Sequence, residues 1–187
     1  MRDITAEIDR ENRIITDLLT LVKMDKKSAD LQISHMNINQ LLEDILKRLR
    51  PIADKRNIDL ILDSFRPVEA DVDELKFTSA ISNLVENAIK YNVDDGWVRV
   101  SLDADHKYFY ITVADSGMGI PEDSIERIFE RFYRVDKSHS KEIGGTGLGL
   151  AITKSSIAMH HGTIKVFSKE GEGTTFSVRI PLSYIPS

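Results

Sequence analysis

Pairs of strands joined by short turns constrain the fold of this chain more than any other feature of its sequence. Alternation of apolar and polar residues predicts two hairpins, whose strands comprise residues 97–103, 108–114, 163–168 and 174–180. Three residues, 104–106, join the first pair, and a turn containing Gly171 and Gly173 joins the second. Hairpins produce antiparallel sheet, and the apolar face of such a sheet has to be covered by other elements.

Helical spacing of apolar residues accounts for most of the remaining chain. Helices are predicted over residues 3–23, 71–91 and 148–160, with another that begins at Asn37 and runs through Leu49, and a short one that ends at Phe129. Asn37 is a capping residue, and Gln40 occupies the capping-box position. Further strands are predicted at residues 58–63 and 68–71. The mixture predicts an α+β fold, a two-layer α/β sandwich of a mixed sheet with helices on one face.

The first predicted helix stands apart from this domain. Its apolar residues form one stripe, made of Ile4, Ile8, Ile15, Leu18, Leu19 and Val22. A stripe of this width needs a partner helix, in this chain or in another. Residues 23–36 are polar and weakly patterned, so we interpret them as a linker. The predicted division is a helical segment (1–25), a linker (26–36) and a main domain (37–187).

Composition excludes several classes of protein. The net charge of −5 argues against non-specific nucleic-acid binding, which needs a cationic surface. The absence of cysteine excludes disulfides and thiolate metal sites. The sequence has no apolar run near the roughly 20 residues of a membrane helix, and its N-terminus is too charged for a secretory signal.

The helix over residues 71–91 carries the motif NLVENAIKY, residues 83–91. Asn83, Asn87 and Lys90 are spaced i, i+4 and i+7, so they share one face. Two amides and an ammonium on one face can hold a metal ion and its phosphates, and amide oxygen suits Mg²⁺. Taken alone, the motif is more often an ordinary polar helix face.

A second motif, DSGMGI (residues 115–120), follows a predicted strand. Asp115 is an acceptor that can bond the exocyclic amine of adenine. Gly117 and Gly119 let the backbone pass close to a flat base. A simple β-turn with aspartate at its first position is the alternative.

A third motif, GGTGLGLAI (residues 144–152), opens a helix. Gly145, Gly147 and Gly149 leave backbone N–H groups unobstructed at a helix N-terminus, which favours an anion. The Thr146 hydroxyl is a further donor. The alternative is a flexible hinge before a capped helix. Neither glycine motif is a P-loop or a complete G-x-G-x-x-G.

In order, NLVENAIKY, DSGMGI, the segment FERFYR (residues 129–134) and GGTGLGLAI resemble the N, G1, F and G2 boxes of sensor histidine kinases. These kinases share a superfamily with gyrase, Hsp90 and MutL. The resemblance spans residues 37–182 and implies an ATP-binding catalytic domain. Residues 1–25 resemble the second helix of the dimerisation hairpin, so the chain is expected to begin after the helix that bears the phosphorylated histidine.

The resemblance also implies roles for individual residues. Asn87 is the Mg²⁺ ligand, Lys90 contacts phosphate, and Arg134 reaches the terminal phosphates from a mobile lid over residues 132–144. Asp115 accepts from the adenine amine, and Thr174 supports it through water. The other residues of the expected ATP site are Asn83, Tyr91, Gly117, Gly119, Ile120, Phe132, Tyr133, Gly145, Thr146, Gly147, Leu148 and Gly149.

The expected reaction is transfer of the ATP γ-phosphate to a histidine of the dimerisation helix, for relay to an aspartate of a response regulator. The parent is expected to be a homodimeric, membrane-anchored bacterial kinase of which this is a cytoplasmic portion. None of the five histidines carries the acceptor pattern: His35 is assigned to the linker, His106 to a turn, His139 to the lid, and His160 and His161 to the end of a helix. The chain is therefore expected not to phosphorylate itself.

Two other activities share these boxes. ATPases of the gyrase, Hsp90 or MutL type place a glutamate one helical turn before the Mg²⁺-binding asparagine, where this chain has Asn83. Glu86 projects about 100° away from Asn87 and does not replace it. A serine kinase of the anti-sigma type normally lacks the FERFYR segment and the preceding helix.

Overall fold

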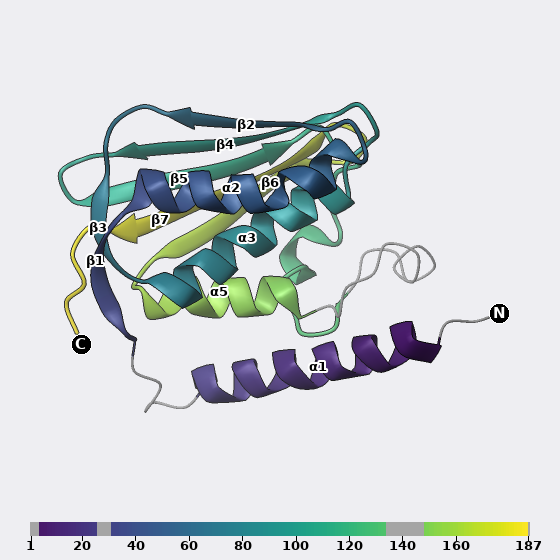
Figure 1. The fold of residues 1–187 in the computed structure, drawn as a ribbon, viewed down its shortest axis with the longest axis horizontal. Coiled ribbons are helices and arrows are strands. Elements are labelled where there is room, and N and C mark those ends of the chain that lie inside the picture. The colour runs from purple at the N-terminus through teal and green to yellow at the C-terminus, as the bar shows by residue number, and fades with distance from the viewer. Residues whose placement is uncertain (1–3, 26–30, 134–147, 187) are drawn as a thin grey trace.

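The structure is a computed structural model that describes residues 4–25, 31–133 and 148–186. Its centre is a five-stranded mixed sheet in the order β2-β4-β5-β7-β6 (Figure 1). The strands are β2 (Asp59–Ser64), β4 (Trp97–Ala104), β5 (Tyr108–Asp115), β6 (Thr163–Lys169) and β7 (Gly173–Pro181). β2 pairs with β4 in parallel, and every other pairing is antiparallel. Both predicted hairpins are present.

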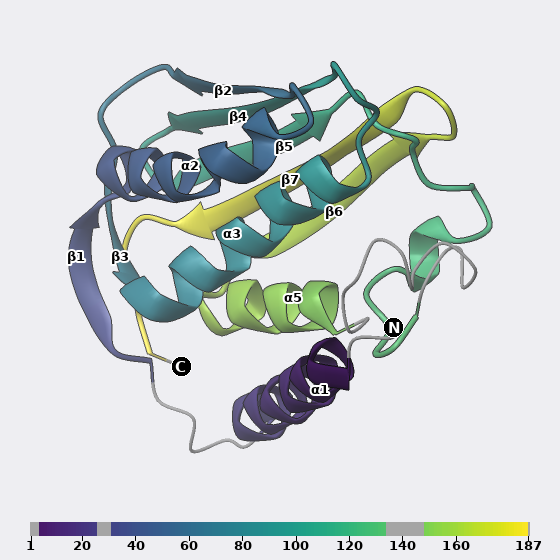
Figure 2. The same cartoon turned by 45° about the vertical axis from the view of Figure 1, so that its right-hand side comes forward.

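Helices α2 (Ile38–Asp54), α3 (Glu74–Lys90) and α5 (Gly149–Met159) cover one face of this sheet, as Figures 1 and 2 show from two directions. Alternate strand residues point toward them, and the buried rows include Val98, Val100 and Leu102 of β4 and Phe109, Ile111 and Val113 of β5. Phe77 of α3 stacks on Phe109 with ring centroids 5.9 Å apart. The predicted two-layer α+β sandwich is confirmed.

Residues 33–36 differ from the sequence prediction. They were expected in the linker, but they belong to β1 (Ile33–Asn37), which pairs antiparallel with β3 (Glu69–Asp73) in a second, two-stranded sheet. His35 therefore lies on a strand, where Nδ1 is 2.9 Å from Asp71 Oδ1 and Nε2 is 3.5 Å from Glu69 Oε2. The pairing joins residues more than thirty positions apart, so local patterning could not reveal it.

Side-chain caps set where α2 and α3 begin. Asn37 caps α2 as predicted, since its Oδ1 accepts from Gln40 N at 3.1 Å. The reciprocal half of the capping box is absent, because Gln40 Nε2 donates to Asp44 instead. Asp73 caps α3 by accepting from Lys76 N at 3.0 Å. Helix α3 therefore begins three residues later than predicted, after β3 has ended.

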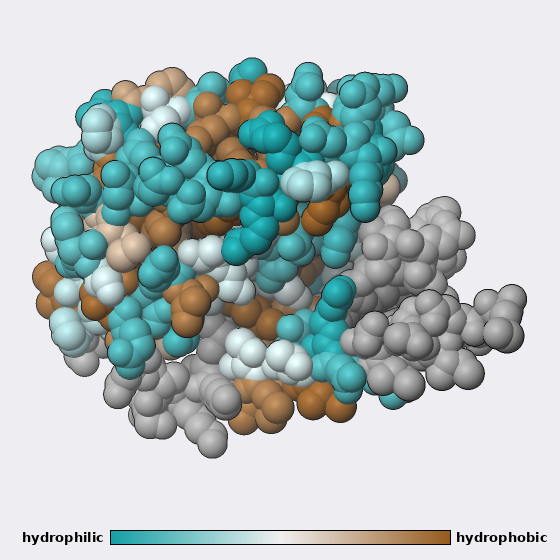
Figure 3. All heavy atoms as spheres, in the orientation of Figure 1, coloured by the Kyte–Doolittle hydropathy of each residue, from teal (hydrophilic) through white to brown (hydrophobic). Residues whose placement is uncertain are grey.

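Helix α1 (Ile4–Asp25) packs along α5. Leu21 is 1% exposed and forms a small apolar cluster with Leu148, Ala151 and Ile152. The opposite side of α1 exposes Ile15, Leu19 and Val22, and Figure 3 shows apolar residues gathered along that lower edge of the molecule. No helix within the described residues combines the length and apolar character needed to cross a membrane.

The remaining predictions fall close to the observed elements. The short helix expected to end at Phe129 is a single 3₁₀ turn, η1 (Ile125–Arg127). His106 is exposed in the turn between β4 and β5, as predicted. His160, at the end of α5, is buried: its Nε2 accepts from Asp73 N and its Nδ1 donates to Ser156 O. His139 lies outside the described residues.

Candidate nucleotide site

Asp115 ends β5 with its side chain on the helix-covered side of the sheet. Its Oδ1 accepts two backbone hydrogen bonds, from Gly117 N at 2.8 Å and from Thr174 N at 3.3 Å. Burial raises the pKa of this carboxyl to about 6, although the two hydrogen bonds act to lower it. A half-buried carboxylate fixed through one oxygen can present the other to a ligand donor.

The loop after Asp115 passes so close to its neighbours that side chains are excluded. A β-carbon on Gly117 would lie 2.5 Å from Tyr91 O and 2.8 Å from Asp115 Oδ1. Gly119 has φ +70° and faces the backbone of Lys169, where a β-carbon would lie 2.2 Å from the carbonyl oxygen. Both glycines are therefore required by close approach of the protein's own backbone, and their predicted approach to a flat base stays a prediction.

Ser168 and Thr174 support this loop from the last hairpin. Ile120 N donates to Ser168 Oγ at 2.8 Å, and Ser168 Oγ is also 2.8 Å from Thr174 Oγ1. Thr174 contacts Asp115 directly through its backbone N–H, while its hydroxyl is bonded to Ser168. Sequence reasoning named Thr174 but missed Ser168, whose position opposite Thr174 in the hairpin register was the available signal.

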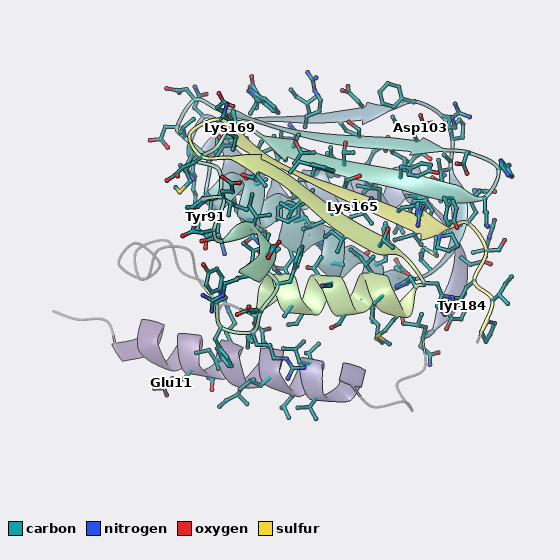
Figure 4. The ribbon with its side chains drawn as sticks, turned by 180° about the vertical axis from the view of Figure 1, so that it is seen from behind. Glu11, Tyr91, Asp103, Lys165, Lys169 and Tyr184 are labelled. Carbon is teal, nitrogen blue, oxygen red and sulfur yellow. The ribbon has the colours of Figure 1, made fainter. Side chains whose placement is uncertain are left out.

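The last turns of α3 approach the same loop. Asn87 and Lys90 are half-buried, and the Asn87 side chain forms no hydrogen bond to another residue that the structure describes. Tyr91 ends the helix, is 38% exposed, and accepts at its carbonyl from Met118 N at 3.1 Å. The amide-bearing helix and the aspartate loop are thus joined at Tyr91, which Figure 4 shows at the same end of the sheet as Lys169.

Asn83 has a different setting from Asn87. Its Nδ2 donates to Gly149 O at 2.9 Å, and a β-carbon on Gly149 would lie 3.1 Å from both Asn83 Nδ2 and Oδ1. Asn83 therefore ties α3 to the first residue of α5. This contact brings the third motif to the first, with Leu148 fully buried just before the helix.

Residues 124–133 fold against the core. Phe129 meets Phe176 edge to face at 6.3 Å, and the Lys154 ammonium lies 5.3 Å from the Phe129 ring centre. Tyr133 donates its hydroxyl to Ser124 Oγ at 2.8 Å, and Phe132 is half exposed with φ 65°. Arg134, Gly145, Thr146 and Gly147 of the predicted site lie outside the described residues.

Ser116 and Asn92, which sequence reasoning did not assign to the site, form hydrogen bonds at the start of the loop after β5. Ser116 Oγ donates to Asn92 Oδ1 at 3.0 Å, and Asn92 Nδ2 donates to Trp97 O at 2.9 Å. Asn92 is buried at 3% exposure. Its position directly after NLVENAIKY was the only indication in the sequence that Asn92 lies near the site. Its contact is with Trp97, the first residue of β4, and local patterning does not predict that contact.

Helix α3 therefore contacts both other motifs: its end meets the β5 loop through Tyr91 O and Met118 N, and Asn83 meets Gly149, the first residue of α5. Residues 72–184 match the family described as "Histidine kinase-, DNA gyrase B-, and HSP90-like ATPase". The chain belongs to this family. It is accordingly an ATP-binding domain, and the resemblance seen in the sequence is confirmed.

Within the family, the similarity is to sensor histidine kinases. The chain is 36% identical to the sensor histidine kinase WalK of Bacillus subtilis over 94% of its own length and 29% of that protein. It is 36% identical to the sensor histidine kinase RppB of Synechocystis over 95% of its length and 39% of the relative. The chain thus spans less than half the length of these relatives.

Solved structures show the same fold. A nucleotide-free catalytic domain of the histidine kinase ThkA superposes with a TM-score of 0.72 at 26% identity, covering 82% of this chain and 97% of that one. Full-length ShkA in complex with AMPPNP superposes with a TM-score of 0.81 at 25% identity, covering 94% of this chain and 36% of the other.

Proposed function

We propose that this chain binds Mg·ATP and donates the γ-phosphate to a histidine on a helical dimerisation segment, for relay to a response-regulator aspartate. The observation that carries the proposal is that α3 contacts both the loop after Asp115, at Tyr91, and the first residue of α5, at Asn83. The AMPPNP named for ShkA supports the ATP ligand. A further ThkA structure in complex with the response regulator TrrA, with a TM-score of 0.77, supports the partner class.

Asp115 would recognise the adenine base of ATP. Its carboxylate accepts a hydrogen bond from an adenine amine at the oxygen that the Gly117 and Thr174 N–H groups leave free. Gly117 and Gly119 provide the close backbone approach that a flat base needs. Tyr91, at 38% exposure, offers an aromatic face beside the same loop.

The phosphates would be held from α3. Asn87 is the candidate Mg²⁺ ligand through its amide oxygen, and Lys90, one helical turn on, is the candidate phosphate contact. A bound Mg²⁺ would offset the charge that develops on the transferring phosphoryl group. In the transfer, an imidazole nitrogen bonds to the γ-phosphorus as the bond to the β-phosphate oxygen breaks, and ADP leaves with that bonding pair. The chain's own contribution is to position the phosphates.

ATP hydrolysis as the main activity is disfavoured by Asn83. ATPases of the superfamily carry their water-activating glutamate one turn before the metal-binding asparagine. Here that position is an amide, and its nitrogen is occupied by Gly149 O. The observed contact gives Asn83 a role in joining two helices instead of activating water.

Titration with AMPPNP, with and without Mg²⁺, tests the proposal. Asp115→Ala is expected to weaken all adenine nucleotides by about tenfold to a hundredfold, and Asn87→Ala to remove chiefly the gain that Mg²⁺ confers. Ser79→Ala, an exposed change on the same helix, is the matched control and should bind as the parent does. Equal binding by all four proteins would show that the pocket lies elsewhere.

A further inference from the structure

Arg56 places its guanidinium at the end of α3 that carries the proposed metal and phosphate contacts. The residue lies in the turn between α2 and β2, outside the residues 72–184 that match the family. Its Nη1 donates to Ile89 O at 2.5 Å and to Lys90 O at 2.9 Å, and its Nη2 donates to Asn92 O at 2.5 Å. One side chain therefore binds three carbonyls at a single helix terminus.

Lys90 O and Asn92 O need outside partners because the last C=O groups of a helix have no partner further along the helix. Ile89 O also accepts from Asn92 N at 3.3 Å, so Arg56 gives it a second bond. Arg56 supplies donors to residues 89, 90 and 92, and Met118 N supplies one to Tyr91 O. The carbonyls of four successive residues, from the end of α3 into the next turn, are thereby satisfied. A guanidinium is also the charge that a helix C-terminus favours.

The position of Arg56 is itself fixed by a neighbouring turn. Asp95 N donates to Arg56 O at 3.2 Å, and Asn57 Nδ2 donates to Asp95 Oδ1 at 2.7 Å. Arg56 Nε also pairs with Asp94 at 3.0 Å, but Asp94 is 76% exposed, so solvent screens this ion pair. The backbone contacts are therefore the ones expected to matter.

We propose that Arg56 is a positioning residue for nucleotide binding: it fixes the last turn of α3, so that Asn87 and Lys90 meet the metal and phosphates. This inference rests on the proposed function. It predicts a selective effect, because Asp115 is held independently by Gly117 N and Thr174 N. Loss of the guanidinium should weaken recognition of the phosphates and leave recognition of adenosine largely intact.

The test compares the affinities of Arg56→Met and Arg56→Lys for Mg·AMPPNP and for adenosine. Arg56→Met is expected to lower Mg·AMPPNP affinity about tenfold and adenosine affinity by less than about threefold. Arg56→Lys keeps the charge but cannot span three carbonyls, so its affinity should lie between those of the parent and Arg56→Met. Amide hydrogen exchange should be faster at Tyr91 and Asn92 in both variants and unchanged in the strands.

Two controls isolate the backbone contacts. Asp94→Asn removes only the exposed ion pair, and Arg66→Met breaks a comparable pair with Asp103, 2.7 Å apart, at the other end of the sheet in Figure 4. Both should bind both ligands within about twofold of the parent. If Arg56→Met does not fold, Arg56→Lys and its exchange pattern decide the question.

Equal loss of affinity for both ligands in a folded Arg56 variant, or no loss at all, would overturn the positioning role. Failure of the parent chain to bind Mg·AMPPNP would instead overturn the proposed function. The two failures are therefore distinguishable in one set of titrations.

Discussion

Replacing Asp115 by asparagine should make the domain more stable and abolish its recognition of adenine. The side chains are nearly identical in shape, and asparagine Oδ1 can still accept from Gly117 N and Thr174 N. The change removes a charge that burial disfavours. It also turns an NH₂ donor toward the place where the base would present its own donor, so nucleotide affinity should fall about a hundredfold or more.

The size of the stability gain follows from the pKa of Asp115. That pKa rises from 3.8 to about 6 in the folded domain. At about 1.4 kcal/mol per pKa unit, the ionised carboxylate destabilises the fold by at most about 3 kcal/mol, and solvent screening of this half-buried group lowers that limit. Because the folded-state pKa is the higher one, this destabilisation is full above pH 6 and disappears as pH falls toward 3.8.

Urea unfolding followed by the fluorescence of Trp97, the only tryptophan, measures this difference. The asparagine variant should exceed the parent by about 1–3 kcal/mol near pH 7.5 and by a small fraction of that near pH 4. The other titrating groups are the same in both proteins, so their contributions cancel in the difference between the two free energies of unfolding. A gap that is absent near pH 7.5, or that stays constant down to pH 4, would refute the argument that Asp115 is an energetically unfavourable carboxylate retained for ligand binding.

Three further changes test other parts of the structure. Gly117→Ala would place a β-carbon 2.5 Å from Tyr91 O, so calorimetry should show weakened AMPPNP binding and a loss of about 1–3 kcal/mol of stability; parent-like binding would contradict the close approach. Burial lowers the pKa of His160 below 6.5, so the neutral form is favoured in the fold and stability should decline as pH drops below 6.5, measured by urea unfolding in the Asp115→Asn background; a flat profile would contradict it. Leu21→Ala should remove about 2–5 kcal/mol of packing between α1 and α5, seen as faster amide exchange in α1; unchanged exchange would show that α1 is held by other contacts.

Much of the fold was predictable because its signals are local. The hairpin strands, the cap at Asn37 and the apolar face of α3 all depend on residues within a few positions of one another. The motif also singled out the glycines of the β5 loop, but their close approach to the backbone at Tyr91 and Lys169 became visible only in the structure.

What sequence reasoning missed depends on contacts between distant segments. Strand β1 is defined by its pairing with β3. Residues 33–36 do not alternate between apolar and polar in the way that predicts a strand from sequence. Helical spacing placed Asn83 on the face of Asn87 and Lys90, but it could not show that the Asn83 amide nitrogen donates to Gly149 O, sixty-six positions away. Arg56 belongs to none of the motifs. Its partners are backbone carbonyls at the end of a helix more than thirty residues later, and no sequence pattern marks such a contact.

A crystal structure of the chain with Mg·AMPPNP would test the convergence of the three motifs most directly. We predict one nucleotide, with its adenine amine on Asp115, its metal on Asn87 and its phosphates between the ends of α3 and α5. A nucleotide bound at any other surface, or one that contacts Asp115 while its metal and phosphates lie away from α3, would contradict the proposed site.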